Sequence, residues 1–298
     1  MSEHQSARTA APDSEFRSRT VPVSGVPVYY VERGSGVPVL ALHGSYVDHH
    51  LMTGCLEPLF AGRPGYRRIY PDLPGMGRTP APGTINSTDD LLDTMLGLID
   101  AVIGDEAFLL VGLSLGGYLA RAIANRRPGQ VAGLCLICPL GAEALGAGRN
   151  VPAHAILHAS GDLGGILDPA LEKQYRDYLV VQTPQTLRSF QEWEGPGIAL
   201  ADLPALERVQ ANWVLRESPE QGAAYPHPAL ILTGRQDSFV GYAAAWGWLA
   251  HYPRATFAVL DRAGHGIEHE QPALFTALLA EWLDRAAEHR ASTGIAPR

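Results

Sequence analysis

Short apolar runs alternate along most of the chain with segments of helical period. The runs expected to form strands are 37–42, 66–70, 107–111, 131–138, 228–233 and 255–260. Because these runs are continuously apolar, they predict strands buried on both faces of a sheet. Helical period covers 91–103, 118–127, 242–251 and a last segment from about Pro272. This alternation predicts an α/β fold with a mostly parallel, doubly wound sheet and helices on both faces.

The two ends of the chain lack this pattern. Residues 1–19 are polar without an apolar core, so we expect a disordered leader rather than a signal peptide. Residues 21–32 alternate apolar and turn residues, which predicts two short strands or a hairpin at the sheet edge. Residues 291–298 are expected to form a loose tail.

One long region breaks the alternation. Residues 139–226 contain no clean buried strand. They contain amphipathic pieces of helical character at 153–159, 170–180, 184–193 and 204–216. We therefore expect a helical lid at 139–226, inserted into a core formed by 20–138 and 227–290 and lying over the carboxyl ends of its strands.

Composition narrows the function classes. The chain has 298 residues and a formal net charge of −8, which gives no electrostatic reason to expect nucleic acid or an anionic membrane as a partner. No apolar run approaches the ~18 residues needed to span a bilayer. The three cysteines are too few for a disulfide framework, so a cytoplasmic location is expected. Cys135 and Cys138 fall on opposite faces of a predicted strand, which indicates core packing rather than redox chemistry.

The chemistry of the chain centres on a turn, Gly112-Leu113-Ser114-Leu115-Gly116, between a predicted strand and a predicted helix. A strand that turns at once into a helix strains the central residue. Side chains two positions before and after it would collide, which explains glycine at both places. The turn lifts the Ser114 hydroxyl clear of the sheet at a helix N-terminus, where negative charge is favoured. Ser114 is therefore the predicted nucleophile.

A serine hydroxyl needs a base, and the base needs an orienting acid. Asp237 and His265 each lie in a loop that follows a predicted strand, at the same sheet edge as Ser114. The chain order Ser, Asp, His is the order used with this serine turn. Asp202 and Asp261 are alternative acids, but Asp202 lies in the expected lid and Asp261 is too close to His265 along the chain.

Four sequence blocks carry a resemblance to a known family. They are His43-Gly44-Ser45, Asp72-Leu73-Pro74-Gly75-Met76-Gly77, the serine turn, and the Asp237/His265 pair. With these blocks the chain resembles the α/β-hydrolase superfamily, in its lidded branch of esterases and carbon–carbon bond hydrolases. The resemblance covers about 21–290 and implies the α/β-hydrolase fold with an inserted lid.

The resemblance implies catalytic roles. Ser114 would form an acyl-enzyme, His265 would move the proton, and Asp237 would hold the imidazole. The oxyanion hole would consist of the backbone N–H groups of Leu115 and Ser45. Neither a metal nor an organic cofactor is expected.

The substrate pocket is less well specified. Tyr46 is the alternative second oxyanion donor, but we expect it, with Trp193, to contact the substrate. The other lid aromatics are candidates for either the pocket or the lid core: Tyr175, Tyr178, Phe190 and Trp213. His43 is expected to brace the oxyanion loop.

Three histidine groups have spacings that a metal site could use, namely Asp48-His49-His50, His154/His158 and His265/His269. Neither pair comes with the Glu of an H-E-x-x-H motif, and adjacent residues rarely converge on one ion. We expect packing or solvated roles for all three groups.

The favoured function is a serine hydrolase that cleaves a small, largely apolar ester. The alternative is hydrolysis of a carbon–carbon bond in a ketone or dienoate ring-cleavage product. Ser45-Tyr46-Val47 stands where such enzymes usually have glycines, and surface positions are expected for Arg188 and Arg216, the candidates to bind a carboxylate. Glu192 and Glu194 could stand for the amine-binding acids of iminopeptidases, whose other motifs are absent.

Two further hypotheses come from other classes. The fold also serves as a non-catalytic receptor for small molecules and as a cofactor-free oxygenase. A small-molecule substrate is the expected partner, and the oligomeric state is left open.

Overall fold

The computed structural model describes residues 15–142, 150–161, 163 and 168–293. Its centre is an eight-stranded sheet with the order β1-β2-β4-β3-β5-β6-β9-β10. The strands are β1 (Arg17–Val23), β2 (Val26–Gly34), β3 (Val37–Leu42), β4 (Tyr66–Pro71), β5 (Phe108–Leu113), β6 (Val131–Ile137), β9 (Ala229–Gly234) and β10 (Ala255–Leu260). The predicted strands are all present.

The pairing of the strands follows the predicted pattern. β2 is antiparallel to both β1 and β4, while the pairs from β4 to β10 are parallel. Every residue of β3, β5, β6 and β9 is buried, which explains their continuous apolar sequences. The edge strand β10 is only half-buried. The mostly parallel sheet is therefore confirmed.

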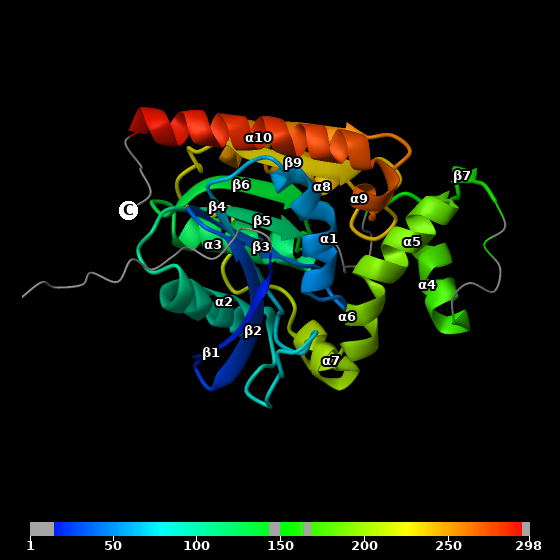
Figure 1. Ribbon diagram of the computed structural model, residues 1–298, viewed down its shortest axis with the longest axis horizontal. Coiled ribbons are helices and arrows are strands. Elements are labelled where there is room, and N and C mark those ends of the chain that lie inside the picture. The colour runs from blue at the N-terminus through cyan, green and yellow to red at the C-terminus, as the bar shows by residue number, and fades with distance from the viewer. Residues whose placement is uncertain (1–14, 143–149, 162, 164–167, 294–298) are drawn as a thin grey trace, which may run out of the picture.

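Helices cover both faces of the sheet (Figure 1). α1 (His49–Phe60) packs against α10 (Pro272–Thr293) on one face. α2 (Thr88–Val102) and α3 (Leu115–Arg126) pack together on the other face. The doubly wound architecture is confirmed. No helix in the described ranges has the length and apolarity required to cross a bilayer.

A cluster of helices lies beyond the carboxyl ends of the strands, at one end of the molecule (Figure 1). It contains α4 (Pro169–Tyr178), α5 (Pro184–Trp193), α6 (Gly195–Leu200) and α7 (Leu203–Ala211). α5 has the bounds expected from the sequence, and it packs against α1 and α6. These helices occupy the region between β6 and β9 that was expected to form a lid.

The prediction of a helix at 153–159 is wrong. Most of these residues are exposed, so they offer no apolar face for a helix to bury. Instead, β7 (His158–Ala159) pairs in parallel with β8 (Val181–Gln182) to form a two-stranded sheet. The lid region therefore contains a short strand pairing that its sequence did not indicate.

Several element ends also differ from the expected ones. β1 begins at Arg17, inside the expected leader, because Arg17 pairs with Glu32 of β2. α10 continues to Thr293, past the expected start of the tail. The helix expected at 242–251 is divided into α8 (Ala243–Gly247) and a 3-10 turn, η1 (Leu249–His251). Residues 1–14 of the expected leader and 294–298 of the expected tail lie outside the described residues.

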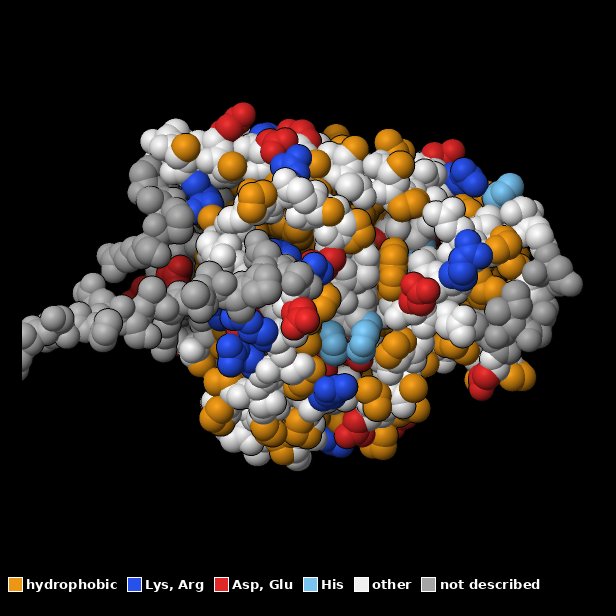
Figure 2. Space-filling model, in the orientation of Figure 1, with side chains coloured by type: hydrophobic (Ala, Val, Ile, Leu, Met, Phe, Trp, Pro, Cys, Tyr) orange, Lys and Arg blue, Asp and Glu red, His pale blue; other side chains and the backbone are white. Residues whose placement is uncertain are grey.

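Cys135 and Cys138 are buried free thiols, as the core interpretation predicted. On the face drawn in Figure 2, acidic and basic side chains are interspersed.

Candidate active site

Ser114 stands between β5 and α3 in a strained backbone conformation, with φ 53° and ψ −113°. Glycine is required at positions 112 and 116 because backbone atoms of other residues approach both positions closely. A Cβ on Gly112 would lie 2.3 Å from the carbonyl oxygen of Gly116, and one on Gly116 would lie 2.2 Å from that of Leu42. Strain of this kind persists only where surrounding structure imposes it, and it is typical of functional turns. The turn has the geometry of a nucleophile elbow.

His265 and Asp237 form a buried pair at the same sheet edge. His265 Nδ1 lies 2.8 Å from Asp237 Oδ2, and Asp237 Oδ1 accepts the backbone N–H groups of Phe239 and Val240. Burial alone would lower the pKa of His265, but the facing Asp237 carboxylate outweighs burial and raises it. Asp237 is thus held in one orientation by three hydrogen bonds.

The alternative acids have other partners. Asp202 caps α7 by accepting from the backbone N–H of Ala205, and Asp261 accepts from the side chain of Gln236. Of the three candidates, Asp237 is the acid that bonds His265.

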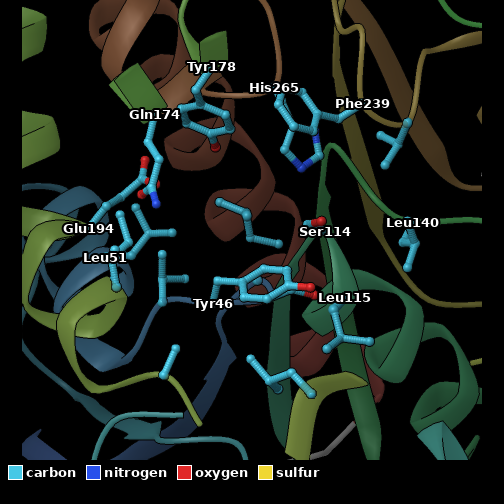
Figure 3. A pocket seen from close by; sticks show the side chains of 18 of the residues that line it. Tyr46, Leu51, Ser114, Leu115, Leu140, Gln174, Tyr178, Glu194, Phe239 and His265 are labelled. Atoms are coloured by element: carbon cyan, nitrogen blue, oxygen red, sulfur yellow. The ribbon is translucent and has the colours of Figure 1, made fainter. Parts of the chain in front are cut away.

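Ser114 and His265 line one cavity of about 670 Å³. Figure 3 shows the imidazole ring of His265 turned toward Ser114 across this cavity. The cavity has a volume typical of small-molecule sites. The structure therefore brings the predicted serine, histidine and aspartate together.

The loop after β3 lies against the serine. A Cβ on Gly44 would lie 3.3 Å from Ser114 Cβ, and Ser45 and Tyr46 both line the cavity. Tyr46 has a positive φ of 67° and a half-exposed side chain. Leu115 is the first residue of α3, so its backbone N–H has no acceptor within the helix. The N–H groups proposed for the oxyanion hole therefore belong to segments beside Ser114.

His43 braces this loop, as predicted. It is fully buried, its Nδ1 donates to the carbonyl oxygen of Gly44, and its Nε2 accepts the backbone N–H of Leu73. Burial lowers the pKa of His43, which keeps the ring neutral and its two hydrogen bonds intact.

The walls of the cavity are largely apolar and aromatic. Three of the lid aromatics line it: Tyr178, Phe190 and Trp213. Trp193 does not line it. Its ring stacks on His269 with centroids 4.9 Å apart, and it lies over Gly54 of α1. Trp193 therefore packs between α1 and His269 and is not part of the cavity wall.

The sequence reasoning did not identify Phe239, which lines the cavity and stacks on the ring of His265 with centroids 5.5 Å apart. Its position two residues after Asp237, in the same loop, was a usable signal. The ring of Tyr178 contacts the same imidazole edge-on, with centroids 5.9 Å apart. Two aromatic rings therefore hold His265 in addition to Asp237.

The described residues that line the cavity include the acids Asp177 and Glu194 but no lysine or arginine. Arg188 is exposed on α5, and Arg216 is paired with Asp89. Glu192, the other acid considered with Glu194, is exposed on α5 and does not line the cavity.

The three histidine groups make hydrogen bonds within the protein. Asp48 Oδ1 caps α1 and bonds His50, while His49 Nδ1 bonds Asp72. His154 lies against the carbonyl oxygen of Arg176. His265 and His269 have separate partners, because His269 bonds Ser189 and Glu194.

Comparison with known proteins gives the family. A sequence model of the alpha/beta hydrolase family matches residues 39–278. The 2-hydroxy-6-oxononadienedioate/2-hydroxy-6-oxononatrienedioate hydrolase of Paraburkholderia phymatum is 29% identical over 276 residues, covering 86% of this chain and 90% of that protein. The 2-hydroxymuconate semialdehyde hydrolase of a Pseudomonas species is 26% identical, covering 90% of this chain and 94% of the relative.

Solved structures agree with the family model. The crystal structure of an alpha/beta superfamily hydrolase from Oenococcus oeni superposes with a TM-score of 0.83 at 28% identity, covering 90% of this chain and 99% of that one. The family match spans more than half of the chain, and the sheet order places the serine turn where this fold requires it. The chain therefore belongs to the alpha/beta hydrolase family of enzymes.

Proposed function

We propose that the chain is a serine hydrolase that cleaves small, largely apolar esters. One observation carries the proposal. The strained Ser114 and the Asp237-bonded His265 face the same cavity, whose walls are mainly aliphatic and aromatic. An apolar cavity of this size suits a modest hydrophobic acyl or alcohol group.

The residues have distinct roles in the proposed reaction. Ser114 Oγ attacks the ester carbonyl while His265 Nε2 removes its proton, and His265 then returns that proton to the leaving alcohol. Water, deprotonated by the same imidazole, hydrolyses the acyl-enzyme and regenerates Ser114. Asp237 holds His265 with Nε2 facing the cavity and stabilises the imidazolium.

We assign the stabilisation of the developing oxyanion to the backbone N–H groups of Leu115 and Ser45. Both belong to segments that lie against the serine, and the N-terminus of α3 adds a favourable dipole. Each such donor typically lowers the barrier by ~3–4 kcal/mol. The tight contact of Gly44 with Ser114 supports this placement.

The second candidate function is carbon–carbon bond hydrolysis, which is favoured by the names of the relatives at 26–29% identity. The name of the Paraburkholderia relative specifies a dioate substrate, which carries two carboxylates. A buried carboxylate needs either a cationic partner or several N–H donors. In the described lining, Asp177 would repel such a group and no lysine or arginine would attract it, so we favour the ester.

The test combines a substrate panel with labelling of the serine. We expect hydrolysis of p-nitrophenyl esters that peaks at short to medium acyl chains, and Ser114→Ala should lower kcat on the order of 10⁶-fold. A fluorophosphonate probe should label Ser114, as located by mass spectrometry. Ser218→Ala, at an exposed serine outside the cavity, is the matched control.

Three outcomes would decide against the proposal. Full activity in Ser114→Ala would remove the serine from the mechanism. A higher kcat/KM on 2-hydroxymuconate semialdehyde than on the best ester would make carbon–carbon hydrolysis the function. Tight binding of a panel ester without release of nitrophenol would favour a receptor.

A further inference from the structure

A second cluster of ionisable side chains lies beside the catalytic cavity. Glu194 lies between α5 and α6 of the lid, while Glu268 and His269 lie in α9 (Ile267–Glu270), which follows His265 closely. His269 Nε2 is 2.9 Å from Glu194 Oε1 and 3.7 Å from Glu268 Oε1. The cluster therefore joins the lid to the segment that carries the catalytic histidine.

The charges of this cluster are not balanced within the protein. Both carboxylate oxygens of Glu268 are buried, and neither has a hydrogen-bond partner among the residues that the structure describes. Within the described part of the chain, the ion pairs of Glu194 and Glu268 are with His269 alone. Burial lowers the pKa of His269 and so favours the neutral ring. An unpaired buried carboxylate is costly, so a proton or a cation must neutralise it.

The donor atoms are arranged around one point. One ligand atom from each of Glu194, Glu268 and His269 lies within 4.8 Å of the other two. His269 Nδ1 lies 2.8 Å from Ser189 Oγ, so an Nδ1–H donated to that hydroxyl leaves the Nε2 lone pair directed at the carboxylates. A hydrogen bond from the other ring nitrogen, which fixes the orientation of the imidazole, is typical of histidines that bind metals.

We propose that Glu194, Glu268 and His269 bind one divalent transition-metal ion of the zinc type, which ties the lid to the His265 segment. One imidazole nitrogen and two carboxylates suit zinc, whereas magnesium and calcium prefer all-oxygen sites. The ion takes the place of the protons on the two carboxyl groups, and its binding releases these protons to solvent. The buried carboxylate of Glu268, which has no hydrogen-bond partner among the described residues, makes a neutralising group favourable.

Two other clusters bring together similar residue types. Cys138, Asp237 and His265 form one, but this is the catalytic pair with a neighbouring thiol. Asp48, His49 and His50 form the other. There, the Nδ1 atoms of both histidines are engaged by carboxylates, and His50 is half-exposed. Variants or probes at these two clusters therefore test whether an ion binds there instead of at Glu194, Glu268 and His269.

Zinc binding to the full chain tests the proposal. After treatment with a chelator and gel filtration, titration calorimetry and elemental analysis should give about one zinc per chain, and zinc should raise Tm by about 3 °C. Magnesium should do neither. Glu268→Gln, which keeps the side-chain shape, should weaken zinc binding at least ~100-fold and abolish the Tm shift. Glu194→Gln is the second ligand variant if Glu268→Gln does not fold.

Matched variants separate this site from the others. Glu192→Gln, at an exposed acid two residues before Glu194, should bind zinc as the unaltered chain does. The proposal is overturned if the chain binds no zinc or if His50→Gln, rather than Glu268→Gln, removes binding. It is also overturned if zinc blocks fluorophosphonate labelling of Ser114 equally in Glu268→Gln, since the ion would then lie at His265. None of these readouts depends on the substrate.

Discussion

Gly234 and Gly264 approach each other so closely that a Cβ on Gly234 would lie 2.0 Å from the carbonyl oxygen of Gly264. Gly234 ends β9, and Gly264 directly precedes His265. Hydrogen bonds between Gln236 and Ala263 hold the same two loops together, with Gln236 N 2.9 Å from the Ala263 carbonyl oxygen. This contact allows the Asp237 carboxylate to reach the His265 ring.

Gly234→Ala is therefore expected to separate the acid from the base. The obstacle is backbone, which cannot move aside as a flexible side chain could, so the free energy of unfolding should fall by about 1–3 kcal/mol. A displacement of about 1 Å at the triad should lower kcat ~10²-fold. Urea unfolding and ester assays measure the two effects. Gly129→Ala is the control because a Cβ there meets open space; equal effects in both variants would contradict the prediction.

Asp237→Asn is expected to keep the fold and lose catalysis. Asparagine can still accept the N–H groups of Phe239 and Val240, but its amide then faces His265 Nδ1 and favours the wrong tautomer. The expected loss in kcat is ~10⁴-fold with little change in Tm. Asp261→Asn, at the exposed acid, should leave kcat unchanged. A loss in kcat of less than tenfold in Asp237→Asn would refute the assigned role of Asp237.

The pH dependence of kcat/KM should report the pKa of His265, the histidine paired with Asp237. His265 must be neutral to accept the serine proton, so kcat/KM falls as pH drops through its pKa. Burial favours the neutral ring, but the facing Asp237 carboxylate outweighs burial and raises that pKa above the ordinary value of 6.5. The midpoint of the acid limb for an uncharged ester should therefore lie above pH 6.5. It should move to lower pH in Asp237→Asn, and a midpoint below 6.5 in the unaltered chain would be contrary to this assignment.

The candidate triad could be predicted because each of its residues follows an apolar run that predicts a strand. In a parallel sheet the carboxyl ends of the strands share an edge, so the sequence predicts that Ser114, Asp237 and His265 lie together. The glycines at 112 and 116 further specified the turn around the serine. These signals are local in sequence, and the fold converts them into a shared site.

The lid side of the cavity could not be predicted in the same way. The sequence shows the spacing of His269 from His265, yet the partners of His269 are Ser189 and Glu194, which lie far away in the chain. The sequence predicts that Trp193 contacts the substrate, but with α5 packed against α1 its ring stacks on His269. Such contacts depend on how the lid helices lie on the core, which amphipathic period alone does not determine.

Glu270 provides the last test, because it connects the lid to the catalytic loop. One carboxylate oxygen accepts the backbone N–H groups of Val180 and Val181 at 2.6 and 3.1 Å, and the other accepts that of Gly264. Burial raises the pKa of Glu270 to about 7, so the carboxylate is ionised at about pH 8. Glu270→Ala removes both acceptor oxygens, and with them three hydrogen bonds, and should destabilise the fold by ~1–3 kcal/mol for each donor left unpaired.

The loss should appear in catalysis as well as in stability, since Gly264 precedes His265. At about pH 8 we expect kcat to fall ~10²-fold in Glu270→Ala, and Glu270→Gln, which keeps an acceptor for β8, to be intermediate. Glu288→Ala, at an exposed glutamate of α10, should change neither quantity. If Glu270→Ala lowered Tm but left kcat intact, the link from β8 to the position of His265 would be absent, and Glu270 would only stabilise the lid.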